Sequence, residues 1–93
     1  MTDVVESQRL TGYDGDIKTL VIISNAACDT GHVIDTNIDS TANVEQIFNT
    51  AITRVRVQET DGADKTATWD NTTGVITLGS ITAGVHNITL EGY

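Results

Sequence analysis

A metal ion could be bound by four residues of one short stretch: Cys28, Asp29, His32 and Asp35. A structural zinc site requires four good ligands in a recognised spacing, and this stretch supplies one cysteine and one histidine. Calcium could be bound weakly by two pairs of carboxylates: Asp14 with Asp16, and Asp61 with Asp64. Neither pair has the EF-hand spacing, and the alternative is that both belong to solvated turns. The sequence therefore predicts neither a metal nor a cofactor.

The triplet Asp29-Thr30-Gly31 is the sharpest catalytic motif in the chain. Two aspartates that share a proton supply both an acid and a base. The triplet resembles that of the aspartic proteases, whose retroviral members are homodimers of β-rich chains close to this length. A glycine-rich flap should then follow, but no glycine occurs between Gly31 and Gly62. Asp-Thr-Gly is also ordinary turn chemistry, so a turn is the main interpretation and a homodimeric protease is a remote alternative.

Other catalytic groups have no supporting motif. None of the serines stands in a Gly-x-Ser-x-Gly sequence, and no glycine-rich phosphate loop is present. His86 falls in the last predicted strand, where a half-buried or edge histidine is more usual than a catalytic base. We therefore expect no catalytic residues and a protein that is not an enzyme.

Five residues could form a contact surface: Tyr13, Arg54, Arg56, Trp69 and Tyr93. Trp69 holds a large share of the aromatic area, since the chain has four aromatic residues. It either packs in the core or between sheets, or anchors a protein interface or a sugar. Tyr13 and Tyr93 could extend such a patch. Arg54 and Arg56 share a strand face, which is either solvated or contacts an acidic partner or another copy.

Charge and composition exclude several kinds of partner. Thirteen acidic residues stand against five Lys and Arg, a formal net charge of −8. A protein that binds nucleic acid or an anionic membrane would need a basic face. Cys28 is the single cysteine, so no internal disulfide is possible, and we expect it to be buried. The first ten residues do not resemble a signal peptide, and the longest apolar run, residues 20–23, is too short to span a membrane.

The clearest folding signal is a hairpin over residues 64–79, in which two β-branched runs flank Asn71-Thr72-Thr73-Gly74. Residues 17–25 contain a continuous apolar block, which predicts a central strand covered on both faces. Residues 50–60 alternate, with Val55 and Val57 on one face and the arginines on the other. Turns are predicted at 13–16 and 61–64, and further strands at 32–38 and 85–91.

The fold class follows from these elements and from composition. Threonine, valine and isoleucine make up 35 of the 93 residues, and β-branched side chains favour strands. Six or seven strands spaced about ten residues apart are typical of a small antiparallel β-sandwich or barrel. Residues 41–49 are the one place for a short helix, because Val44, Ile47 and Phe48 have helical spacing. We expect a flexible arm over residues 1–8 and one β domain over 9–93.

The chain as a whole, most visibly TATWDNTTGVITLGSITAGVHNITLEGY at residues 66–93, resembles the small capsid decoration, or cement, proteins of tailed viruses. The resemblance implies an acidic β-sandwich or barrel on the capsid surface, made in the host cytoplasm without a signal peptide. It implies a homo-oligomer, with a trimer favoured, that contacts the major capsid protein or another virion protein and stabilises the shell by bridging subunits. It carries no catalytic residues. The alternative is a carbohydrate-binding or surface-fibre β module.

Overall fold

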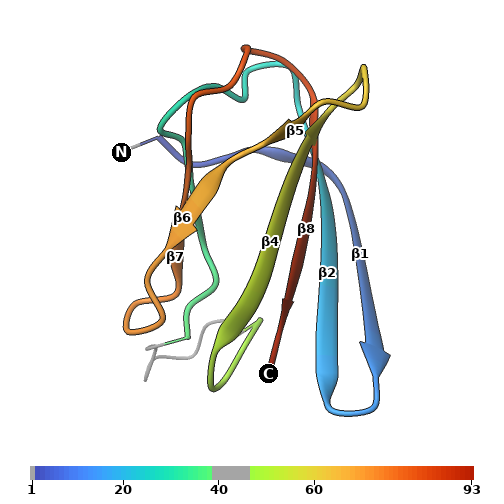
Figure 1. The fold of residues 1–93 in the computed structure, drawn as a ribbon, viewed down its shortest axis with the longest axis vertical. Coiled ribbons are helices and arrows are strands. Elements are labelled where there is room, and N and C mark those ends of the chain that lie inside the picture. The colour runs from blue at the N-terminus through green and yellow to red at the C-terminus, as the bar shows by residue number, and fades with distance from the viewer. Residues whose placement is uncertain (1, 39–46) are drawn as a thin grey trace.

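The computed structural model describes residues 2–38 and 47–93 and shows two antiparallel β-sheets packed face to face (Figure 1). The larger sheet has the strand order β1-β2-β8-β4-β5 and the smaller sheet the order β3-β7-β6. The strands are β1 (Glu6–Asp14), β2 (Ile17–Ser24), β3 (Val33–Asp35), β4 (Ile52–Glu59), β5 (Asp64–Lys65), β6 (Ala67–Trp69), β7 (Val75–Leu78) and β8 (His86–Gly92). Within the described ranges, no helix has the length and apolar character needed to cross a membrane.

The hairpin predicted over residues 64–79 is present, since β6 pairs with β7 and the turn ends at Gly74. The backbone of Gly74 has a φ of 74°, and its carbonyl oxygen accepts hydrogen bonds from the backbone N and Oγ1 of Thr36, at 3.0 and 2.8 Å. A Cβ atom at this position would overlap Thr36 Oγ1 and lie 2.7 Å from Cγ2 of Ile38. Glycine is therefore required both by the turn and by the close approach of the segment after β3.

The core lies between the two sheets and consists of apolar side chains from both. The larger sheet contributes Leu20, Ile22, Ile52, Val57, Ile88 and Leu90, and the smaller sheet contributes Ile34, Ile76 and Leu78. Phe48, from the loop before β4, is fully buried in the same cluster. Alternation places these residues on the inner face of each strand, as expected of a sandwich.

The prediction of an all-β antiparallel fold is confirmed. Of the two predicted architectures, a sandwich or a barrel, the structure shows the sandwich and not a closed barrel. The described residues form eight strands and not six or seven, because β1 was not among the predicted strands and the run before the Asn71 turn is divided into β5 and β6. The predicted turns at 13–16 and 61–64 close the β1–β2 and β4–β5 hairpins. Of the possible helix at 41–49, residues 41–46 lie outside the described residues, and residues 47–49 are not helical.

The prediction that residues 17–25 are covered on both faces is wrong. Leu20, Ile22 and Ser24 are buried against the smaller sheet, but Val21 and Ile23 lie on the outer face and are half-buried. The smaller sheet covers only the inner face of the larger one, and no described segment lies on the outer face. Hydrophobicity alone does not tell whether a strand is covered on one face or on two.

The predicted boundary between an arm of residues 1–8 and a domain of 9–93 does not coincide with an element boundary. Strand β1 begins at Glu6, and residues 2–4 lie beside β3. Val4 N donates to Val33 O at 2.8 Å, and Val33 N donates to Thr2 O at 2.9 Å. The first residues therefore contact both sheets, while the flexibility predicted for them stays a prediction.

Candidate functional site

Three of the four aromatic residues lie partly exposed at one end of the sandwich: Tyr13, Trp69 and Tyr93. We call this surface the aromatic end. One row of paired residues crosses it, from Tyr13 through Lys18 and Gly92 to Ile52. Adjacent strands are about 4.8 Å apart, so Tyr13 and the end of β8 are separated by about 10 Å. Figure 1 shows the β1–β2 turn, the end of β8 and the β6–β7 turn at this same end.

Trp69 lies on the inner face of β6, opposite the buried Ile76, at the open side of the sandwich next to β4. Its indole Nε1 donates a hydrogen bond to the carbonyl oxygen of Ile52 at 3.1 Å, and 37% of the residue remains exposed. Asn71 holds the same residue, since its Oδ1 accepts from Ile52 N at 2.8 Å. Trp69 therefore both closes an edge of the sandwich and presents part of its ring to solvent.

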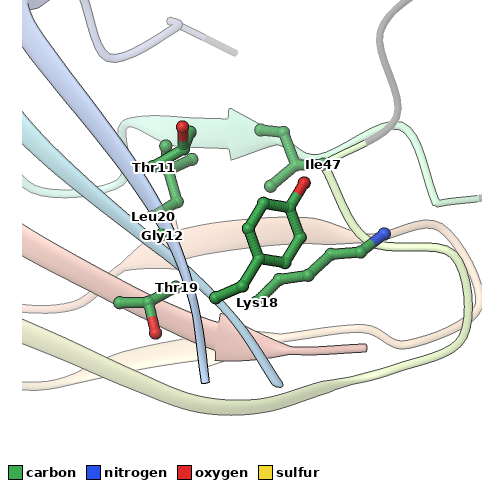
Figure 2. Close-up of a pocket in the computed structure, with 7 residues that line it drawn as sticks. Thr11, Gly12, Lys18, Thr19, Leu20 and Ile47 are labelled. Atoms are coloured by element: carbon green, nitrogen blue, oxygen red, sulfur yellow. The ribbon is translucent and has the colours of Figure 1, made fainter. Parts of the chain in front are cut away.

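The two tyrosines are more exposed, at 76% for Tyr13 and 43% for Tyr93. The backbone of Tyr93 is held by the loop before β4, because its carbonyl oxygen accepts from Asn49 N and Thr50 N and its own N donates to Ala51 O. Tyr13 lines a small pocket of about 170 Å³ on the inner side of β1 and β2. Figure 2 shows the pocket's other lining residues, with Thr11, Lys18 and Leu20 from these strands and Ile47 from the loop before β4.

The two arginines share the outer face of β4, as predicted, but each of them faces a carboxylate. Arg54 lies 3.8 Å from Glu91, and Arg56 Nε lies 3.1 Å from Oδ1 of Asp64. Both arginine side chains are at least half exposed, so these pairs add little to stability. The pairing leaves no unbalanced positive patch on this face, and of the two arginines only Arg54 lies near the aromatic end.

Asp29-Thr30-Gly31 forms a turn on the surface between β2 and β3. Oδ1 of Asp29 accepts from Thr30 N at 2.7 Å, and the Thr30 hydroxyl exchanges hydrogen bonds with the backbone of Ile81, both at 3.1 Å. The backbone N of Asp29 donates to Nδ1 of His32 at 3.2 Å. The groups of the triplet are therefore used in fastening this loop to the segment before β8, which agrees with the turn interpretation.

Cys28 is buried, as expected, at 1% exposure. Desolvation raises the pKa of its thiol above the ordinary value, a nearby hydrogen bond with Ser24 lowers it, and the charge of Asp29 raises it further. Across the described residues, no three His, Cys, Asp or Glu side chains gather as a metal site would require. Of the carboxylates that could bind calcium weakly, Asp61 accepts from Ala63 N at 3.0 Å and Asp64 pairs with Arg56.

A buried polar cluster around Glu59 and His86 was not predicted from the sequence. His86 is 1% exposed, with Nδ1 2.8 Å from Gly84 O and Nε2 3.4 Å from Oε2 of Glu59. Desolvation raises the pKa of Glu59, but hydrogen bonds from Thr82 N and from Lys65, together with the Lys65 charge, outweigh it and lower the pKa. The two residues meet because β4 pairs with β8, and a local sequence pattern does not reveal such a pairing.

A second feature missed by the sequence is the exposed surface of β1. Leu10 is 70% exposed on the outer face, beside Val21 of β2, and Ile23 lies next along that strand. Together with Gln8 and Arg9, these residues line a shallow, mostly apolar depression. The available signal was a single leucine between polar residues, which is too common to identify a contact surface.

Comparison with known proteins found no match among family models, curated proteins or solved structures.

Proposed function

We propose that this protein is a non-enzymatic structural protein of a virion, which decorates the capsid surface and stabilises the shell by bridging its subunits as an oligomer. The proposal begins from the resemblance of the chain to small capsid decoration proteins. The major capsid protein, or another virion protein, is then the partner, and no cofactor is involved.

The observation that best supports the proposal is the aromatic end. Tyrosine and tryptophan supply most of the energy of many protein interfaces, because they bury a large area with few rotatable bonds. Tyr13 is exposed there on β1, Tyr93 is exposed on a backbone held by the loop before β4, and Trp69 contributes part of its ring. An acidic surface elsewhere, with a net charge of −8, keeps such a protein soluble while one apolar end remains available.

Stabilisation of the shell would follow from mass action. A protein that binds assembled subunits, and not dissociated ones, shifts the equilibrium toward the assembled state. At a hundredfold excess over the dissociation constant, each occupied site contributes about 2.7 kcal/mol. Because a shell repeats the site many times, a modest affinity at each copy is sufficient.

The test compares particles made with and without this protein in thermal and osmotic rupture. We expect the decorated particles to rupture at a higher temperature and to survive a larger osmotic step. Tyr13→Ser combined with Tyr93→Ser should abolish binding to bare particles. Val85→Ser is the matched control, because Val85 is an exposed apolar residue that precedes β8 at the other end of the sandwich. Equal rupture with and without the protein would remove the proposal.

A carbohydrate-binding or surface-fibre module is the second candidate, and the partly exposed ring of Trp69 favours it. Aromatic rings in sugar sites present one face to solvent, and the indole N–H of Trp69 is already held by Ile52 O, which fixes the ring. A glycan array gives the test. Binding that is lost in Trp69→Ala and kept in Val85→Ser would favour this candidate, and an array without signal would exclude it.

A further inference from the structure

Strand β1 is an edge strand of nine residues, and no described segment pairs with its free edge, the edge away from β2. Its residues from Glu6 to Tyr13 are exposed, apart from the half-buried Gly12. Figure 1 shows β1 as the outermost strand of the larger sheet, away from the smaller sheet. Such an edge presents a row of backbone N–H and C=O groups to any strand that can pair with it.

The other sheet edges in the described part of the chain are short or covered. Residues 2–4 lie along β3 and bond to Val33. On the far side of the larger sheet, β5 pairs with the end of β4, and Trp69 and Asn71 bond to Ile52 at its start. Strand β6 has three residues. Natural proteins protect the edges of their sheets in these ways. The long, open edge of β1 is an exception, and we therefore expect another strand to pair with it.

Strand β1 has few of the usual devices against edge pairing. The chain contains no proline, and β1 contains no lysine. A register shift between Glu6 and Gln8 interrupts the start of the strand, but residues 8–14 are regular. Arg9 is the one charged residue from position 8 to position 13, and it forms an ion pair with Glu6 at 2.7 Å. Residues 8–13 can therefore accept another strand without burying an unpaired charge.

We propose that β1 pairs antiparallel with β1 of a second copy of this chain, with a two-fold axis through Thr11. The hairpin closes at the Asp14–Ile17 pair, so the backbone groups of Asp14 face β2. Alternation then directs the backbone groups of Thr11 and Tyr13 toward the open edge. Residue 11 is the midpoint of the regular residues 8–14, and a register centred there pairs the whole of this part with its copy.

The register is self-complementary, and this property favours a second copy over an unrelated strand. At the axis Thr11 meets Thr11, a favourable cross-strand pair. Leu10 lies opposite Gly12 of the second copy, where a Cβ atom would meet nothing within 4 Å. Arg9 lies opposite Tyr13 of the second copy, in reach of a cation–π contact. No like charges face each other, whereas a register centred on Arg9 would oppose two guanidinium groups.

The pairing joins two larger sheets into one sheet of ten strands, formed from five in each copy. It brings the exposed Leu10 of both copies, with Val21 and Ile23, into one apolar surface across the junction. The result is a dimer in place of the trimer that the family resemblance implies. Because the paired strands are antiparallel, the two aromatic ends point in opposite directions.

The test uses charges placed on the axis. Thr11 is exposed, so Thr11→Lys and Thr11→Glu should fold, and each puts like charges opposite each other in a homodimer. We expect each variant to weaken the dimer by about tenfold or more at low salt. Mixing the two variants should restore a heterodimer, because lysine then faces glutamate. Thr68→Lys and Thr68→Glu, at an exposed threonine of β6, are the matched controls and should dimerise like wild type.

Sedimentation equilibrium or native mass spectrometry measures these dimers, at concentrations from about 10 μM to 1 mM, since small interfaces are often weak. Thr11→Cys gives a second readout. The Cα atoms of a hydrogen-bonded pair in an antiparallel ladder, as Thr11 would form here, lie about 5.5 Å apart, within the range of a disulfide. Oxidation should therefore yield a covalent dimer, whereas Thr68→Cys should not. Cys28 does not interfere, because it is buried.

Three results would overturn the inference. Wild type that stays monomeric throughout this range has no such dimer. A dimer that persists in both Thr11 variants uses another surface. Loss of dimer without recovery on mixing, or loss in Thr11→Lys alone, shows a register that is not centred on Thr11. None of these measurements involves a capsid, so the dimer can fail while the proposed virion function stands, and the reverse also holds.

Discussion

Replacement of Gly74 by alanine tests whether the turn of the β6–β7 hairpin is fixed by a close contact as well as by its backbone conformation. The φ of 74° is unfavourable for any residue with a Cβ atom, at about 1–2 kcal/mol. The new methyl group would also overlap Thr36 Oγ1 and lie 2.7 Å from Cγ2 of Ile38, far inside ordinary van der Waals contact. To relieve this overlap, the segment that contains Thr36 and Ile38 must move away from the turn.

The two effects add to a large fraction of the stability of the domain. Forcing an extra carbon into a packed site costs about 1–3 kcal/mol. Movement of Thr36 also weakens its two hydrogen bonds to Gly74 O, at about 1 kcal/mol each. Alanine lowers the entropy of the unfolded chain, which returns about 0.4–1 kcal/mol. We therefore expect Gly74→Ala to lose about 3–6 kcal/mol, from a total of about 5–14 kcal/mol for a chain of this length.

Gly31→Ala is the matched control. Its φ of 78° is close to that of Gly74, but a Cβ atom there would meet nothing within 4 Å. This variant has the conformational cost without the overlap, so it should lose about 1 kcal/mol. Urea denaturation followed by Trp69 fluorescence measures both variants. The steric reasoning is refuted if the two lose equal stability, and the conformational reasoning is refuted if Gly31→Ala loses none.

Three further predictions concern buried groups. Phe48→Ala should lower the unfolding free energy by about 3–5 kcal/mol in the same urea assay, because Phe48 is fully buried in the core; a loss below about 1 kcal/mol would contradict its position. The lowered pKa of Glu59 stabilises the fold above its unfolded pKa, near the ordinary 4.5, and this stabilisation is lost as pH falls through the folded pKa. Thermal unfolding of Glu59→Gln should consequently depend less on pH in this acid range than wild type, and parallel curves would exclude the effect. Burial raises the pKa of the Cys28 thiol and shields it from solvent. At pH 8 this thiol should therefore react with a disulfide reagent on the order of a hundredfold more slowly in the native protein than in denaturant. Equal rates would show that the thiol is accessible in the native protein.

The strands that bury one face could be predicted from the sequence, because burial of one face makes apolar and polar residues alternate along the strand. Val55 and Val57 alternate with Arg54 and Arg56, and the structure places the two pairs on opposite faces of β4. Strand β1 could not be predicted in this way. Both of its faces are open, so its sequence has no alternation, and it forms because β2 supplies a partner across a tight turn.

The candidate site was predicted as residue types and not as an arrangement. The sequence indicates Tyr13, Trp69 and Tyr93 only because aromatic residues are few in this chain. Their meeting at one end depends on β8 lying between β2 and β4, an order that no local pattern contains. The same order brings His86 to Glu59. Arg54 and Arg56 were correctly placed on one face, but their pairing with Glu91 and Asp64 depends on neighbouring strands.

The central position of β8 also determines how the domain can fold. Its neighbours, β2 and β4, begin about 70 and 34 residues earlier in the chain, and neither pairs with the other. The β1–β2 and β4–β5 hairpins can form alone, but an isolated hairpin is marginal in water. The larger sheet therefore remains in two separate pieces until β8 has been synthesised and inserted between them. Folding should be slow and highly cooperative, as in other proteins dominated by distant pairings, with the last step at the centre of the sheet and not at its edge.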